Sequence, residues 1–561
     1  MILKTRIPMP LMAIAPIAAG LLLALCTACF LLCIPAIEAD AETDRSQSPS
    51  SLLAARAGDT ARQSTLVVTV AIDPFDPGRP VPQQFLGLSF EAAALDQLAR
   101  YADRGDLVRL LRSLGPGVLR FGGITADENV AWTDAATPRP AWASSVIGPA
   151  QLHAIGVLAR RSGWRVLLTV GLAHYEPIAA AREVAAAHRA LGPYLAAVEI
   201  GNEPNAYGSH DLRELPWIAQ GYEEEVSFYR EAIAVLTPGV PIAGPDVSGS
   251  GTFAEWGEEE ALSQTPALLT GHHYPLGCAQ TPAPSIEALL SAATRGREAR
   301  SLRTYLSVAN ANRIPLRIDE TNSVSCGGVA GISDTFASAL WASAYITQAM
   351  AAGATGVNLQ GNPVNCAGYT PLCAPDPAAL AAGRLRAQPE WYALLLTRSL
   401  VGDRPLPTTI TAGGSPVKSP PAEGPSSESP AVEGSSGESS PVAAAPNLVA
   451  AAFSAPDHSL KVVLVDDEPP GTSPLALRLD VGGGLGAAHI LRLTAPSQGA
   501  TAGVQLAGRA VAANGSWAAP KRTQSVAPHA GILALELAPG SAVLVSISRS
   551  RATPRKHGKE R

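Results

Sequence analysis

The chain has 561 residues, too many for a single hydrophobic core, so we expect one large domain and a smaller one. Its formal net charge is −6. Nucleic-acid-binding proteins usually carry an excess of Lys and Arg, which this acidic chain does not have, so no nucleic-acid partner is expected.

The N-terminus carries Lys4 and Arg6, followed by an almost uncharged run over residues 8–37. This pattern predicts an export signal, and the run is also long enough to span a bilayer. Residues 1–41 are therefore expected to be a signal peptide or a membrane anchor, and residues 42–63 a linker. A lipid-attachment site at Cys29 fits the pattern less well. We expect the rest of the chain to be exported, in the periplasm, secreted, or anchored with its catalytic domain outside the cytoplasm.

Seven cysteines are present, and three of them lie in the N-terminal segment. Four cysteines in an exported domain can form up to two disulfides in three connectivities. We expect Cys366 to pair with Cys373, and Cys278 with Cys326. Their spacing does not match a zinc site.

Residues 64–72 form a β-branched run that predicts a strand. After it, short apolar runs alternate with long helical segments, which is typical of a parallel sheet covered by helices. Eight such runs predict a (β/α)8 barrel over residues 84–400. The expected barrel strands are 85–90, 117–121, 166–170, 197–200, 241–244, 268–273, 315–319 and 356–359.

Two of the intervening helices are well marked. Residues 149–162 have a proline near their start, apolar residues at three-residue spacing and Gly163 at their end. Residues 332–352 begin at Ser333-Asp334, which are residue types that favour a helix N-cap.

After residue 400, short extended runs without helical periodicity predict a β-sandwich over residues 401–548. The runs are 447–454, 460–465, 475–481, 489–493 and 542–548, and residues 64–83 are expected to add a strand. Residues 412–446 consist mainly of Ser, Pro, Glu, Gly and Ala, so they are predicted to be a disordered insertion. Residues 549–561 are basic and are expected to form a solvated tail.

Two of the expected barrel strands end in a glutamate. Glu203 follows the run 197–200, and Glu320 follows the run 315–319. One such residue is typically a solvated turn residue. Two of them at the C-terminal ends of barrel strands, where the active sites of this fold lie, indicate a glycosidase pair.

Hydrolysis of a glycosidic bond needs one group to protonate the leaving oxygen and another to attack or stabilise the anomeric carbon. We expect Glu203 to be the acid/base and Glu320 the nucleophile. Asn202 is expected to bind the sugar hydroxyl beside the anomeric carbon, and Tyr274 to donate its hydroxyl to Glu320. Alternatively, Asn202 caps a turn and Tyr274 packs at the rim.

His272 and His273 have no Asp or Cys at a local spacing that suits a metal site, so we expect histidines at the rim or behind the site. The glycine pairs at 327–328 and 413–414 match no phosphate-binding loop.

These residues also carry a family resemblance. Asn202-Glu203-Pro204 together with Glu320 resembles the large clan of retaining glycosidases built on this barrel. More narrowly, three segments resemble glycoside hydrolase family 79, which contains β-glucuronidases and heparanases. They are Glu199-Ile200-Gly201-Asn202-Glu203-Pro204-Asn205, Leu119-Arg120-Phe121-Gly122-Gly123, and Glu320-Thr321-Asn322-Ser323 followed by Gly327-Gly328.

The resemblance covers about residues 64–548 and implies a retaining, exo-acting β-glycosidase with a carbohydrate substrate and no metal or organic cofactor. No protein partner is implied. In members that bind glucuronate, a Gly-Tyr pair after strand eight holds the sugar carboxylate, and Gly368-Tyr369 match it. Further contacts with sugar hydroxyls are expected from Ser89, Glu91, Asp127, Asn129 and Trp132.

One departure concerns the substrate. The family often places an aromatic residue soon after Glu-Thr-Asn-Ser, where this chain has Val324-Ser325-Cys326. The expected activity is release of terminal β-linked glucuronic acid or its 4-O-methyl form. A retaining β-glycosidase for neutral sugars and a non-catalytic carbohydrate-binding barrel are the alternatives. Heparan sulfate is disfavoured because no Lys/Arg cluster lies around the site segments.

Overall fold

The computed structural model describes residues 67–413, 415–417 and 446–550, which belong to one compact unit. The expected leader and linker, nearly all of the expected insertion, and the tail beyond residue 550 lie outside the described residues. Within the described part of the chain, no helix combines the length and the apolar character needed to cross a membrane.

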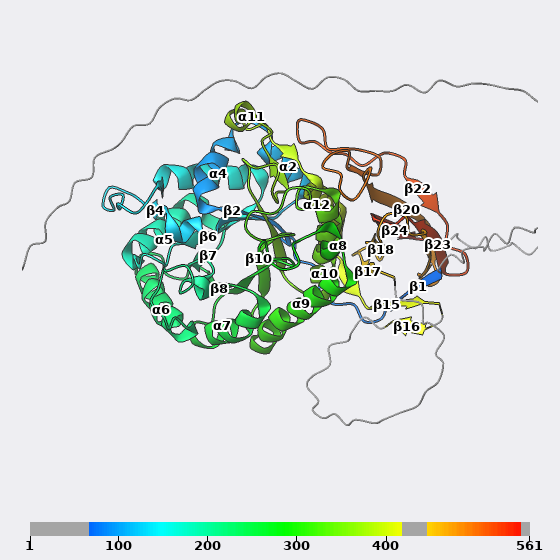
Figure 1. The fold of residues 1–561 in the computed structure, drawn as a ribbon, viewed down its shortest axis with the longest axis horizontal. Helices are drawn as coiled ribbons and strands as arrows, with labels where there is room; N and C mark the ends of the chain where they lie inside the picture. Colours follow the sequence, from blue (N-terminus) through cyan, green and yellow to red (C-terminus); the bar gives the residue numbers. More distant parts are fainter. Residues whose placement is uncertain (1–66, 414, 418–445, 551–561) are drawn as a thin grey trace, which may run out of the picture. The chain divides into compact units, whose positions relative to one another are not determined.

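Eight parallel strands close into a barrel, and helices surround it (Figure 1). Each strand overlaps one of the eight runs expected from the sequence, so the predicted barrel is confirmed. The strands are mostly buried on both faces, as expected for parallel strands enclosed by helices. In spatial order they are β2 (Leu86–Glu91), β3 (Val118–Gly122), β6 (Arg165–Val170), β7 (Leu195–Ile200), β8 (Ile242–Ser248), β9 (Leu268–His273), β10 (Leu316–Thr321) and β11 (Gly356–Gly361).

The main helices follow the barrel strands along the chain. They are α1 (Leu95–Ala99), α2 (Leu107–Leu114), α4 (Pro149–Ser162), α5 (Pro177–Leu191), α6 (Ala219–Leu236), α7 (Ser250–Ser263), α9 (Ala292–Asn312), α10 (Phe336–Ala352) and α12 (Pro389–Thr397). Shorter elements in the loops are α3 (Thr125–Glu128), β4 (Val130–Trp132), β5 (Ser145–Ile147), α8 (Ile286–Leu289), β12 (Leu372–Cys373), α11 (Pro377–Ala382) and β13 (Arg386–Ala387). Helix α4 has the bounds expected from its proline and glycine.

Helix α10 starts later than its sequence pattern suggested. Its N-cap is Thr335, because the side chains of Ser333 and Asp334 are used in the preceding turn. Ser333 Oγ accepts a hydrogen bond from the amide of Val329, and Asp334 Oδ1 accepts one from the amide of Gly331.

Two sheets form the β-sandwich. One has the order β16-β15-β1-β19-β23, and the other has the order β14-β17-β18-β24-β20-β21 with β22 beside β20. Strand β1 (Val67–Ile72) runs parallel to β19 and antiparallel to β15, so the predicted N-terminal strand of the sandwich is confirmed. The others are β14 (Arg404–Leu406), β15 (Thr408–Ala412), β16 (Ser415–Val417), β17 (Leu448–Ser454), β18 (Leu460–Asp466), β19 (Leu475–Asp480), β20 (Leu485–Thr494), β21 (Gln505–Leu506), β22 (Gln524–Val526), β23 (Ile532–Leu537) and β24 (Ser541–Arg549).

The sandwich satisfies polar groups of the barrel domain. The amides of Phe336 and Ala337, at the start of α10, donate to the carbonyls of Ala500 and Gln498, both at 2.8 Å. These amides have no partner within the helix, so the sandwich loop supplies their acceptors. Lys461 of β18 donates to the carbonyl of Ser399, at the end of the barrel domain. Helix α10 itself is almost wholly buried.

The four cysteines of the described chain form the pairs Cys278–Cys326 and Cys366–Cys373, the pairing suggested by the sequence. The first disulfide joins the loops that follow β9 and β10. The second closes the loop that follows β11. Both therefore lie at the C-terminal ends of barrel strands.

The two disulfides should differ in their contribution to stability, because they close loops of 48 and 7 residues. Loop-closure entropy predicts that removing Cys278–Cys326 lowers the free energy of unfolding by about 4 kcal/mol, and removing Cys366–Cys373 by about 2 kcal/mol. Paired Cys→Ser variants compared by urea denaturation measure both values. A larger loss for the shorter loop would contradict this ranking.

Candidate active site

Glu203 lies just beyond β7 in a strained backbone conformation. Its φ of 46° and ψ of 51° place it in the left-handed region, which a non-glycine residue rarely adopts. Its amide donates to the carbonyl of Asp246 at 2.9 Å, and its own carbonyl accepts from the amide of Ala206. Such strain is typical of functional sites, where surrounding contacts maintain it. The side chain is 27% exposed.

Glu320 is on β10, and both of its carboxylate oxygens have donors. Tyr274 donates its hydroxyl to Oε1 at 2.8 Å, and Arg120 Nη1 donates to Oε2 at 2.8 Å. The side chain retains 10% exposure. The carboxylate is thus held in one orientation while still reaching solvent.

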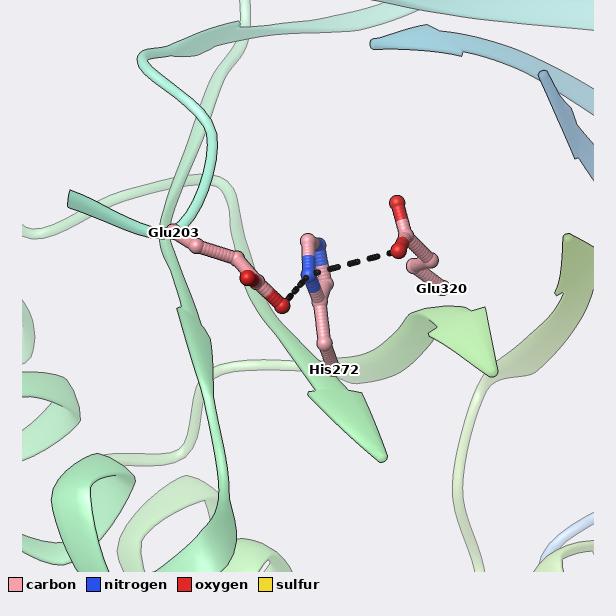
Figure 2. A group of neighbouring side chains, drawn as sticks. All are labelled: Glu203, His272 and Glu320. Atoms are coloured by element: carbon pink, nitrogen blue, oxygen red, sulfur yellow. Dashed lines mark hydrogen bonds and ion pairs between the residues drawn. The ribbon is translucent and has the colours of Figure 1, made fainter. Parts of the chain in front are cut away.

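The two glutamates point toward one another from different strands, with His272 between them (Figure 2). One oxygen of each carboxylate and one nitrogen of His272 all lie within 4.8 Å of one another. Retaining glycosidases separate their two carboxyl groups by about 5–5.5 Å, and inverting enzymes by about 6.5–9.5 Å. The 4.8 Å limit applies to one oxygen of each carboxylate, and it is nearer to the first of these ranges than to the second.

Arg120 of β3 is fully buried and lies among four carboxylates. Its guanidinium contacts Glu199 at 2.8 Å, Asp246 at 2.6 Å, Asp319 at 3.0 Å and Glu320 at 2.8 Å. Burial alone would lower the pKa of Arg120, but these negative charges outweigh it and raise the pKa well above its usual value. Burial, together with the charges of Asp246 and Glu199, raises the pKa of Asp319. A buried charge is costly unless it is paired with an opposite charge and hydrogen-bonded, as the Arg120 guanidinium is here.

Arg120 also determines which way Asn202 faces. Its Nη2 donates to Asn202 Oδ1 at 2.9 Å. A guanidinium only donates, so the amide oxygen must face Arg120 and the N–H2 group faces away. Asn202 and Glu203 line the same cavity, so this amide is placed to meet a ligand beside the carboxylate.

His272 is fully buried rather than at the rim. Its Nδ1 lies 2.9 Å from Glu203 Oε1, and its Nε2 lies 2.9 Å from Asp246 Oδ1. The charges of Asp246 and Glu320 and the two hydrogen bonds overcome the effect of burial, so the pKa of His272 is raised well above its usual value. His273 instead stacks on Tyr345.

Within the described residues, two groups have the spacing of metal ligands: Glu203, His272 and Glu320, and Asp246, His272 and Asp319. Both groups depend on His272, whose two nitrogens are already hydrogen-bonded to carboxylates. Arg120 supplies positive charge to Asp246, Asp319 and Glu320. The shared imidazole is therefore engaged on both nitrogens and a guanidinium already neutralises the carboxylates, so we assign no metal here.

Tyr369 reaches the pair from the loop after β11. Its hydroxyl lies 3.4 Å from that of Tyr274. Its amide donates to the carbonyl of Gly327 at 3.1 Å, so the phenol is the group left for a ligand. A Cβ on Gly368 would lie 2.2 Å from the Gly327 carbonyl oxygen, and a Cβ on Gly328 would lie 2.5 Å from the Tyr369 nitrogen. Only glycine allows these two loops to approach so closely.

Glu91, at the end of β2, lies near Glu320, at the same end of the barrel. Its carboxylate accepts from the amide and hydroxyl of Thr125, at 3.0 and 2.7 Å, and from Gln360 at 3.4 Å. Burial and then the charge of Glu320 raise its pKa, as expected for two neighbouring carboxyls.

Three other residues expected to contact the sugar are Ser89, Asp127 and Asn129, and their surroundings differ from one another. Ser89 is fully buried, and its hydroxyl accepts a hydrogen bond from Arg120 Nη1 at 3.1 Å, so it supports the guanidinium inside the barrel. Asp127 lines the cavity beside Glu203, and it accepts backbone N–H groups of Leu172, Ala173 and Asn202, so it also holds the loops after β6 and β7. The described cavity beside Glu203 does not include Asn129, whose carbonyl accepts amides of the β5 segment.

Trp132 lines a different cavity, together with Trp142, His174 and Glu183. Its Nε1–H is buried without a partner among the described residues. Burial raises the pKa of Glu183 to about 8. This structure therefore does not bring Trp132 to the glutamate pair.

Sequence reasoning identified the two glutamates, Asn202 and Tyr274, and the structure brings them together. It assigned no role to Arg120, Asp246 or Asp319. Arg120 could have pointed to these residues, because it is a charged residue within an otherwise apolar barrel strand. A buried guanidinium requires carboxylate partners.

No protein-family model matches the sequence, and no match was found among curated proteins. The fold is shared with solved structures of glycoside hydrolases. A 4-O-α-L-rhamnosyl-β-D-glucuronidase from Fusarium oxysporum 12S is 19% identical, with a TM-score of 0.64, and the match covers 85% of this chain and 100% of that one.

Two arabinofuranosidases have the same architecture. The family 51 enzyme from Xanthomonas axonopodis pv. citri is 13% identical, with a TM-score of 0.58 and coverage of 86% and 100% of the two chains. The α-L-arabinofuranosidase from Thermotoga maritima is 14% identical, with a TM-score of 0.57 and coverage of 85% and 99%. At these identities, the likeness establishes the barrel and sandwich fold.

Glu183 should make stability depend on pH. Because its pKa is raised to about 8, the unfolded chain loses this proton at lower pH than the folded chain, so stability falls between about pH 4 and pH 8. Glu183→Gln should raise the free energy of unfolding by up to about 5 kcal/mol above pH 8 and leave it nearly unchanged at pH 4. Urea denaturation of both proteins across this range measures the difference. A pH-independent difference would contradict the assignment.

Proposed function

We propose that the chain is a retaining β-glycosidase that works by double displacement. The observation that carries this proposal is the opposed pair of Glu203 and Glu320, with carboxylate oxygens within 4.8 Å. Their different partners match their different roles. Glu320 accepts hydrogen bonds from two donors, whereas Glu203 contacts an imidazole and is the more exposed side chain.

In the first step, a Glu320 oxygen attacks the anomeric carbon while Glu203 protonates the departing glycosidic oxygen. A covalent glycosyl–Glu320 ester results, and the alcohol leaves. In the second step, Glu203 takes a proton from water, the hydroxide attacks the same carbon, and Glu320 leaves as a carboxylate. Two inversions give net retention.

Asn202 would assist both steps. Its N–H2 group faces away from Arg120 and lies beside Glu203, where it can donate to the sugar hydroxyl next to the anomeric carbon. Such a contact strengthens as positive charge develops on the ring in the transition state.

We propose a β-glucuronide, or its 4-O-methyl form, as the substrate, released from the end of a glycan or from a small glucuronide. The resemblance to family 79 supports this choice, as does the glucuronidase named among the structures with this fold. Tyr369 is the matching residue, and its phenol lies beside Tyr274 and Glu320. A phenol can donate a charge-assisted hydrogen bond to a sugar carboxylate.

A neutral glycone, as in a xyloside or a glucoside, is the second candidate. The Arg120 guanidinium contacts Glu320 but is fully buried among carboxylates, so it cannot reach a uronate. Glu91 adds a carboxyl near Glu320 and Tyr369, and a charged Glu91 would repel a sugar carboxylate.

We also propose that the chain is exported. The two disulfides support this proposal, because such bonds persist mainly in oxidising compartments. The leader-like sequence of residues 1–41 agrees with it.

The roles of the two glutamates can be tested separately with an aryl β-glycoside that has an activated leaving group. Glu320→Gln should abolish turnover because no nucleophile remains. Glu203→Ala should form the glycosyl ester and release it slowly, and azide should restore turnover because it attacks without base catalysis. Proton NMR should show the β-anomer forming first in the wild type. Normal turnover by both variants, or initial α-anomer, would exclude the mechanism.

The glycone choice should appear in Tyr369→Phe. If the phenol binds a uronate, the variant should raise KM for an aryl β-glucuronide about 10-fold and leave an aryl β-xyloside unchanged, since one hydrogen bond to a charged group is lost. Tyr175→Phe, at an exposed tyrosine, is the matched control. Efficient xyloside hydrolysis with no glucuronide turnover in the wild type would favour the neutral glycone instead.

A further inference from the structure

A chain of hydrogen bonds leads from Glu203 into the barrel. His272 Nδ1 lies 2.9 Å from Glu203 Oε1, and His272 Nε2 lies 2.9 Å from Asp246 Oδ1. His272 is fully buried, and Asp246 is too. The imidazole therefore connects a partly exposed carboxyl to one that water does not reach.

Strand β8 is distorted at Asp246. The pairing register between β8 and β9 shifts between Pro245 and Val247, and Asp246 has a φ of 61°, in the left-handed region. The Asp246 carbonyl accepts the Glu203 amide at 2.9 Å, while its side chain binds His272. Asp246 therefore holds both the backbone of Glu203 and the imidazole that contacts the Glu203 side chain.

We propose that His272 is a positioning residue that stores the proton used by Glu203, and that Asp246 keeps the imidazole charged and oriented for this transfer. The inference rests on the proposed glycosidase function and extends it to the resting state of the acid. In the resting enzyme, both ring nitrogens of His272 carry a proton, with Nδ1–H donating to Glu203 and Nε2–H donating to Asp246.

The proton balance is simple. As the glycosidic bond breaks, Glu203 gives the proton on its other carboxylate oxygen to the departing oxygen and receives the Nδ1 proton on Oε1, so it stays protonated. His272 is then neutral, with Nε2–H still bonded to Asp246. In the second step, Glu203 returns the Oε1 proton to Nδ1 while its other oxygen takes a proton from water, which restores the resting state.

The charges around His272 favour this state. Asp246 and Glu203 contact its nitrogens, and Asp319 Oδ2 and Glu320 Oε1 each lie 3.9 Å from a ring nitrogen. The positive charge of Arg120, whose Nη2 lies 2.6 Å from Asp246 Oδ2, opposes protonation of His272. Tyr305 donates to the His272 carbonyl, and Tyr274 donates to Glu320. Burial acts to lower the pKa of His272, but the negative charges of Asp246 and Glu320 and the hydrogen bonds to Asp246 and Glu203 raise it.

The first test compares leaving groups. A 2,4-dinitrophenyl glycoside needs almost no protonation on departure, whereas a methyl or benzyl glycoside needs it fully. His272→Gln should reduce kcat/KM about 100-fold or more for the poor leaving groups and less than about fivefold for dinitrophenyl. His273→Gln is the matched control, since it alters a buried histidine of the same strand that contacts neither glutamate.

The second test uses pH. Asp246→Asn removes one charge but keeps an acceptor for Nε2–H, so His272 should lose its proton at lower pH. The alkaline limb of kcat/KM for a poor leaving group should then move down by about 1–3 pH units. In wild-type protein carrying ¹⁵N-labelled histidine, the His272 signals, assigned by their absence from His272→Gln, should show two protonated nitrogens at pH 7. This measurement remains decisive if Asp246→Asn does not fold.

The outcomes separate this inference from the proposed function. Equal losses for all leaving groups, or a neutral His272 at pH 7, would overturn the proton-store role while Glu320→Gln and azide rescue still support a glycosidase. Failure of those two glutamate variants to behave as described would overturn the function itself. A selective loss in His272→Gln together with a charged His272 would support the inference.

Discussion

The burial of one guanidinium among four carboxylates is the interaction on which the site depends. Arg120 reaches from β3 to Glu199 on β7, Asp246 on β8, and Asp319 and Glu320 on β10. Four carboxylates could not share the interior of a barrel without a cation, because desolvation and mutual repulsion would both oppose burial. The arginine therefore joins four strands at the end of the barrel where the glutamate pair lies. It also orients the carboxylate of Glu320 and the amide of Asn202, so stability and site geometry depend on the same side chain.

Glu203 is not in direct contact with that guanidinium. Its contact is the imidazole of His272, which leads to Asp246 and only then to Arg120. The two opposed carboxyl groups therefore have different partners although they lie close together. Glu320 is held by the phenol of Tyr274 and the guanidinium of Arg120, which take no part in the proposed proton transfer. Glu203 is held by the imidazole of His272, a group that can exchange a proton with it. A retaining mechanism needs this asymmetry, because one carboxyl must attack as an anion and the other must alternate between acid and base.

The barrel could be predicted from the sequence because short, mostly apolar runs alternate with helical segments. The two glutamates could be found because they follow such strands, and the C-terminal ends of barrel strands meet on one face. Strands of two or three residues, such as β21 and β22, carry too little pattern to be recognised. The network around Arg120 depends on which side chains point inward across the barrel, and spacing along the chain does not give that direction. Trp132 shows the same difficulty in a loop, since its position after β3 did not indicate that it lines another cavity.

The proposed catalytic pair and the residues proposed to recognise the sugar are held in place differently. Glu203, Glu320 and Asn202 are held by strands and by the buried charges between them. Tyr369 lies on a loop whose position is set by the disulfide Cys366–Cys373 and by backbone contact with Gly327 and Gly328, next to Cys326. Strands β3, β7, β8 and β10 cannot move apart without breaking ion pairs of Arg120, whereas these loops can change sequence between their disulfides without disturbing those ion pairs. Differences in glycone preference among proteins with this fold are therefore expected in segments equivalent to 324–328 and 366–373, while the strand-borne carboxyl groups keep the same geometry.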